Sequence, residues 1–202
     1  MTEPFVHHLR ITERTREALR SLVGSTPYQV VSDTLRVRWP SVETTYLALG
    51  RGDDSGYVVF TSETRETPAE RDYGRIHASE MRTLSGSTGG EEESGAWYQT
   101  LISLDGEPST VSLWPGSGGR PITSISVFEE AIAAPPLPDY GSEDVRADSV
   151  LVFACGRADA FCIRVGHTMR PVVEFYGDWR LVSETTRTLR EVESIPPREE
   201  WQ

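Results

Sequence analysis

The sequence predicts an α+β fold, made mainly of an antiparallel sheet of hairpins with a few short helices packed on it. Short runs that alternate apolar and polar residues, with turn-forming residues between them, indicate three strand–turn–strand units. Helical periodicity is confined to short segments between those units, so the regular strand–helix alternation of a parallel sheet is missing. The expected class is therefore antiparallel α+β.

The first predicted element is an amphipathic helix over residues 11–24. Its apolar residues fall on one stripe at helical spacing: Ile11, Ala18, Leu19, Leu22 and Val23. Thr12 is a suitable N-cap and Gly24 a suitable C-terminal stop. Further short helices are expected over 74–86, over 126–132 (where Ser126 and Glu129 form a capping box) and at the end of 180–195.

Strands are predicted around these helices. Residues 34–39 alternate apolar and polar side chains, as a half-buried strand does. Residues 44–62 form a hairpin around the turn-rich segment 51–56, and residues 96–114 form a second one around Asp105-Gly106, a type I′ turn signal. Loops are expected over 63–75, 85–95 and 115–121.

One segment predicts a boundary within the chain. The three prolines of residues 133–144 exclude helix and central strand. We interpret this segment as a connection between an α+β N-terminal part, residues 1–132, and a hairpin-and-helix C-terminal part, residues 145–195. One continuous domain is the alternative, since 202 residues suit either arrangement.

Both cysteines lie in the predicted C-terminal hairpin. With a turn at residues 156–159 and Ala160 opposite Cys155, Cys155 and Cys162 become diagonal neighbours on one face. Such a pair is about 7–8 Å apart, beyond the usual disulfide range. No CxxC or HxxxH spacing accompanies them, so a zinc site would lack ligands. We interpret them as buried structural thiols. The alternatives are a metal or redox site, or a Cys–His nucleophile in which one cysteine pairs with His167 or His77.

The composition limits the chemistry. The net charge is -11, all twenty basic residues are arginine, and the sequence contains neither lysine nor asparagine. A Schiff-base lysine, a P-loop lysine and a catalytic asparagine are therefore excluded. An acidic chain is not expected to bind nucleic acid non-specifically, but it suits a basic protein partner. We expect no cofactor.

The N-terminal stretch "MTEPFVHHLR" lacks the apolar segment of a secretory signal. No apolar run approaches the roughly 20 residues that span a bilayer. We therefore expect a cytoplasmic protein with no membrane partner.

Two stretches resemble known immunity families. Residues 150–179, with the final predicted helix and "PLPDY" at 136–140, resemble the C-terminal half of the SUKH group, although Gly156-Arg157-Ala158-Asp159 replaces its glycine-rich turn and its tryptophan-glycine element is missing. Residues 81–114, "MRTLSG…SGAWYQTLISLDGEPSTVSLW", resemble immunity proteins of the YezG kind, and each resemblance covers under a third of the chain. Both groups include proteins that neutralise bacterial polymorphic toxins. The resemblances thus imply a non-catalytic cytoplasmic immunity-type protein that contacts a toxin.

Acidic and aromatic residues are the candidates for that contact. They are Asp53, Asp54, Glu91, Glu92, Glu93, Glu174, Tyr176 and Trp179. A second hypothesis is an enzyme or small-ligand protein with a pocket in residues 155–178, where Cys155, Cys162 and His167 lie. A third is a structural or assembly protein of a phage or secretion apparatus.

Overall fold

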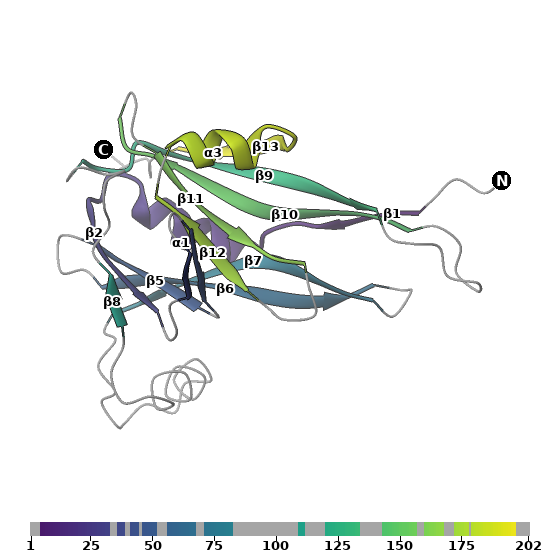
Figure 1. The fold of residues 1–202 in the computed structure, drawn as a ribbon, viewed down its shortest axis with the longest axis horizontal. Coiled ribbons are helices and arrows are strands. Elements are labelled where there is room, and N and C mark those ends of the chain that lie inside the picture. Colours follow the sequence, from purple (N-terminus) through teal and green to yellow (C-terminus); the bar gives the residue numbers. More distant parts are fainter. Residues whose placement is uncertain are drawn as a thin grey trace, which may run out of the picture.

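The computed structural model describes residues 5–32, 36–38, 41–44, 46–51, 56–67, 71–82, 109–111, 120–133, 143–156, 160–167, 172–177 and 179–196. These residues form two β-sheets that face one another across a shared core (Figure 1). Helix α1 (Glu13–Leu22) contacts an edge strand of each sheet, and helix α3 (Trp179–Thr186) lies on the outer side of the larger sheet. The described chain is thus mostly antiparallel sheet with two short helices, as predicted.

The larger sheet has eight strands. Seven follow the order β13 (Arg190–Ile195), β9 (Ser124–Ala133), β10 (Glu143–Ala154), β11 (Ala160–Val165), β12 (Val173–Tyr176), β4 (Ser41–Thr44) and β3 (Arg36–Arg38). Strand β1 (Phe5–Leu9) pairs with β10 in parallel, whereas the other described pairs are antiparallel. Because β9 pairs along nearly all of β10, β1 and β11 must follow one another along its other edge.

The smaller sheet has five strands, in the order β7 (Asp72–Met81), β6 (Tyr57–Glu66), β5 (Tyr46–Arg51), β2 (Pro27–Ser32) and β8 (Ser109–Val111). The predicted hairpin over 44–62 is confirmed as β5 and β6. Part of the predicted strand 34–39 is confirmed as β3, which pairs with β4. The larger sheet joins residues from both sides of the proline-rich connection, since β10 pairs with β9 and β12 pairs with β4.

Aromatic rings fill the space between the sheets. Phe60 of the smaller sheet meets Phe153 of the larger one edge to face, with centroids 5.9 Å apart. Phe153 stacks on Phe161 at 4.6 Å, and Phe161 contacts Phe175 at 5.6 Å. Rings of this size bury large apolar areas, so this row contributes strongly to holding the sheets together.

The predicted N-terminal helix is confirmed as α1. The Thr12 side chain accepts a hydrogen bond from the backbone N–H of Thr15, as a helix N-cap does. Ala18, Leu19 and Leu22 are buried against the core, which explains the apolar stripe. Gly24 follows the helix with φ +90°, a conformation that glycine adopts without strain.

Two predicted helices are wrong. Residues 126–132 lie in β9, which is paired on both sides, with β10 and β13. Residues 74–81 lie in β7, which pairs with β6 over its whole length, where Ile76 and Ala78 are buried at the strand spacing of two. Cross-strand pairing and burial outweigh local helix signals of this kind, because each strand residue gains packing partners on its neighbours.

Two further boundaries need correction. The predicted loop 63–75 is largely strand, since β6 continues to Glu66 and β7 begins at Asp72. The helix expected at the end of 180–195 lies at the start of that segment, where α3 ends at Thr186. The end of the segment forms β13, on the edge of the larger sheet. The predicted loops 85–95 and 115–121, the turn at Asp105-Gly106 and the connection 133–144 lie wholly or largely outside the described residues.

The C-terminal hairpin is confirmed, but its predicted register is wrong by one residue. Ala160 pairs with Ala154 rather than with Cys155, and Cys162 pairs with Val152. A shift of one residue moves every side chain of one strand to the other face. The two cysteines therefore lie on opposite faces: Cys155 in the core between the sheets, and Cys162 beneath α3 with Val182.

Candidate functional site

The most exposed large apolar side chain of the described chain is Trp179. It begins α3 and is 57% exposed. The guanidinium carbon of Arg180 lies 5.8 Å from the centroid of its ring, within the range of a cation–π contact. An exposed tryptophan whose ring is steadied by a neighbour is well suited to a contact with another molecule.

Strand β12 leads directly to this tryptophan. Val173 and Phe175 are buried, whereas Glu174 and Tyr176 point the other way, as the sequence predicts for Glu174. The Tyr176 hydroxyl donates a 2.8 Å hydrogen bond to Glu174 Oε2. Burial, followed by this bond to a carboxylate, raises the pKa of Tyr176, so its hydroxyl remains a donor. We call Glu174, Tyr176 and Trp179 the Trp179 surface.

A second group of polar residues adjoins Glu174 through its strand partner Arg164. Arg164 Nη2 lies 3.1 Å from both oxygens of Glu130, and Ser149 Oγ donates to Glu130 Oε2 at 3.3 Å. His167 Nε2 lies 3.4 Å from Glu130 Oε2, and the imidazole is 11% exposed. We call these four residues the Glu130 cluster.

This cluster favours the ionised form of its central carboxyl. The contact with His167 and the positive charge of Arg164 lower the pKa of Glu130 to about 2, although half-burial acts in the opposite direction. Glu130 is therefore a fixed negative charge at neutral pH and cannot serve there as a general acid. The cluster is thus suited to orienting Arg164 and His167.

The two thiols are poorly placed for chemistry. Both are thiols rather than halves of a disulfide, and both are buried. Burial raises the pKa of the Cys162 thiol to about 12, so almost none of it is thiolate near neutral pH. Because the hairpin places Cys155 on the opposite face, Cys155 and Cys162 do not line one pocket with His167.

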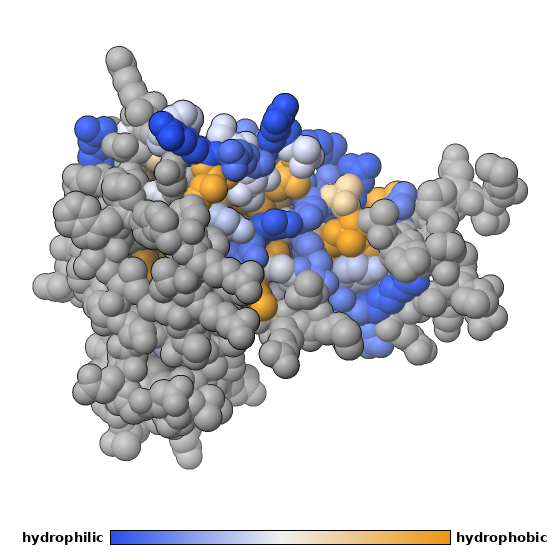
Figure 2. Space-filling view, viewed as in Figure 1, coloured by the Kyte–Doolittle hydropathy of each residue, from blue (hydrophilic) through white to orange (hydrophobic). Residues whose placement is uncertain are grey.

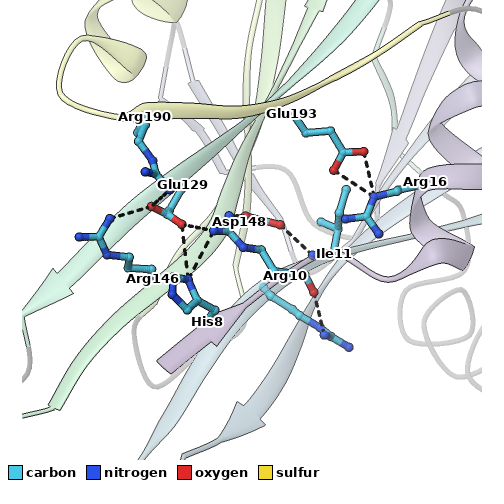
Figure 3. A network of polar contacts seen from close by, with 10 residues as sticks. His8, Arg10, Ile11, Arg16, Glu129, Arg146, Asp148, Arg190 and Glu193 are labelled. Carbon is cyan, nitrogen blue, oxygen red and sulfur yellow. Dashed lines mark hydrogen bonds and ion pairs between the residues drawn. The ribbon is translucent and has the colours of Figure 1, made fainter. Parts of the chain in front are cut away.

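A third group of polar residues surrounds Glu129 (Figure 3). Arginines from three segments contact its buried carboxylate: Arg10 at 2.7 Å, Arg146 at 3.2 Å and Arg190 at 3.2 Å. Arg10 also reaches the buried Asp148, at 2.9 Å. We call these five residues the Glu129 network; His8 Nδ1 borders it, 3.8 Å from Glu129 Oε2.

Asp148 connects the Glu129 network to the backbone that follows β1. Its Oδ2 accepts a 2.8 Å hydrogen bond from the backbone N–H of Ile11, just after β1 ends. The pairing of β10 with β9 is irregular between Asp148 and Val150, and the partners of β10 change from β1 to β11 across the same residues. At this break the buried Asp148 carboxylate is the acceptor for a backbone N–H that the strand pairing leaves without one.

The sequence contains few signals that predict the Glu129 network. Arg10 lies more than a hundred residues before the other members, and Glu129 looks locally like the N3 residue of a capping box. The one available signal is that two charged residues interrupt an otherwise apolar run in "SVFEEAI". Among the predicted contact residues, Asp53, Asp54, Glu91, Glu92 and Glu93 lie outside the described residues.

The face of the molecule in Figure 2 carries small apolar areas separated by hydrophilic side chains. Within the described part of the chain, no three histidine, cysteine or acidic residues are grouped so that they could hold a metal ion. None of its helices is long and apolar enough to cross a bilayer. In comparisons with known proteins, no family model, no curated protein and no solved structure matches this chain.

Proposed function

We propose that this chain is a non-catalytic binding protein of the immunity type, which neutralises a toxin by protein–protein contact. The observation that carries the proposal is the 57% exposure of Trp179. The other large apolar side chain exposed among the described residues is Val6, at 40%. Apart from Val6, the large apolar side chains that the structure describes are buried or half-buried, so exposure of Trp179 costs free energy that binding would recover.

The surroundings of Trp179 support contact with a protein. Tyr176 and Glu174 are half-buried and hydrogen-bonded to one another, so they would lose little side-chain freedom on binding. The net charge of -11 favours encounter with a basic toxin domain, because opposite potentials steer association. Within the Trp179 surface, Trp179 would supply the aromatic contact and Glu174 a carboxylate.

The thiols argue against the second hypothesis, an enzyme or small-ligand site in residues 155–178. Cys162 is a protonated thiol beneath α3, and Cys155 is enclosed between the sheets. Glu130 is ionised, and its carboxylate contacts Arg164 and His167. A buried, protonated thiol and an ionised carboxylate held by two cationic side chains do not make an activated nucleophile.

The test is a tagged pull-down from native extract at low and moderate salt, followed by affinity measurement on the purified partner. Trp179→Ala should weaken binding roughly thirtyfold, as loss of a central aromatic contact does, while Val6→Ala should change it little. The partner should be basic, bind less tightly as salt rises, and be a toxin whose activity the chain suppresses on co-expression.

Other outcomes would change the proposed contact residues or favour a different function. Unchanged affinity of the Trp179→Ala variant would remove the Trp179 surface from the contact. A bound small molecule in native mass spectrometry, with no protein partner, would favour the ligand-binding hypothesis. A large oligomer that depends on concentration would favour a structural or assembly protein.

A further inference from the structure

The Glu129 network holds more positive charge than its carboxylates neutralise. Three arginines face two carboxylates, Glu129 and Asp148, so the network carries a net positive charge within a chain of net charge -11. Both carboxylates are buried, so they cannot reach out to neutralise charge at the surface. The positive charge is therefore presented on the outside of the network.

The exposed arginines are only partly used. Arg146 and Arg190 each reach Glu129 through one terminal nitrogen, and their side chains are 40% and 62% exposed. A guanidinium has five N–H donors in a planar fork, and a single contact leaves most of them available. Arg10 is committed more fully, since it bridges both carboxylates.

We propose that Arg146 and Arg190 form a binding site for an oxyanion, a carboxylate or a phosphate group presented by another molecule. The guanidinium fork matches the spacing of oxygens on both groups. The buried Glu129 anchors both side chains from below, so little side-chain freedom remains to be lost on binding. The site lies on β10 and β13 and uses no residue of the Trp179 surface.

The negative charge of a neighbouring residue, Asp144, opposes the site. Asp144 is exposed and lies two residues from Arg146 on β10, which puts both side chains on the same side of that strand. Its carboxylate repels an incoming anion. The Asp144→Asn variant should therefore bind the anion severalfold more tightly, an effect that a purely structural arginine network would not show.

The first arm of the test titrates the protein with inorganic phosphate, followed by NMR of the arginine side-chain N–H groups. Saturable shifts at Arg146 and Arg190 are expected, and Arg146→Gln/Arg190→Gln should weaken binding roughly tenfold or more. The matched control is Arg14→Gln, which removes an exposed arginine from α1. Thermal unfolding of each variant checks that the fold is intact.

The second arm uses a hexaglutamate peptide in place of phosphate. Preference for the peptide identifies a protein carboxylate as the natural group, and preference for phosphate identifies a phosphorylated molecule. No saturable binding of either probe, or equal binding by wild type and the double variant, would overturn the proposal. Trp179→Ala should leave both titrations unchanged, because the anion site and the Trp179 surface share no residue. Failure of the anion-site proposal would therefore leave the proposed function standing.

Discussion

Glu129 and Asp148 are paired residues on the neighbouring strands β9 and β10, and both carboxylates are buried. Like charges directly opposite each other destabilise a sheet. Arg10 offsets this repulsion, since its Nη2 lies 2.7 Å from Glu129 and its Nη1 lies 2.9 Å from Asp148. The segment that joins β1 to α1 is thereby tied to the middle of the larger sheet.

Removal of that bridge should destabilise the fold. Arg10→Gln leaves two buried carboxylates facing each other, and we expect a loss of about 3 kcal/mol in the free energy of unfolding. Urea denaturation measures it, with Arg14→Gln as a control expected to change it by less than about 0.5 kcal/mol. The double variant Arg10→Gln/Glu129→Gln should lose less than the sum of the single changes; strict additivity would show that the residues do not interact.

The Glu130 cluster predicts a dependence of stability on acid pH. The pKa of Glu130 is about 2 in the fold against an ordinary value of 4.5, so the ionised carboxyl is favoured by folding. Its contribution is complete above pH 4.5 and is lost as the pH falls through 4.5 toward 2. Wild type should therefore exceed Glu130→Gln in unfolding free energy at neutral pH, with the difference shrinking at about pH 3.

The matched control for that comparison is Glu80→Gln, since Glu80 is exposed on β7. Its difference from wild type should be small at both pH values. A difference between wild type and Glu130→Gln that stays constant from neutral to acid pH would contradict the altered pKa of Glu130.

The thiols should be unreactive in the native protein. Cys155 and Cys162 are buried, and the pKa of Cys162 is about 12 because burial disfavours the thiolate. Alkylation by iodoacetamide near neutral pH should therefore be slow in buffer and rapid for both thiols in concentrated urea. Fast labelling of one thiol under native conditions would show that this thiol is accessible to solvent. The variants Cys155→Ala and Cys162→Ala would identify the labelled cysteine.

The aromatic row predicts a large core effect. Phe153 contacts rings from both sheets, so Phe153→Ala should lower the free energy of unfolding by about 4 kcal/mol. Phe153→Leu, which keeps much of the volume, should cost less. Val6→Ala, at an exposed position on β1, should cost less than about 0.5 kcal/mol. A loss of under about 1 kcal/mol for Phe153→Ala would contradict the contact between the sheets.

The sequence by itself determined the elements whose signals are local. Helix α1 follows from an apolar stripe, the Thr12 cap and Gly24, all within one short segment. The hairpin of β5 and β6 follows from two apolar runs on either side of turn residues. The alternation of side chains along a strand places Glu174 on the side opposite Phe175. Each of these features depends on neighbours along the chain.

Only the tertiary structure decided the rest. A capping box in 126–132 favours a helix locally, but strands on both sides draw it into β9. The register of the C-terminal hairpin differs from the prediction by one residue, which separates Cys155 from Cys162. The Glu129 network joins Arg10, Arg146 and Arg190 from distant segments. Pairing and burial act between residues remote in sequence, so local patterns do not encode them.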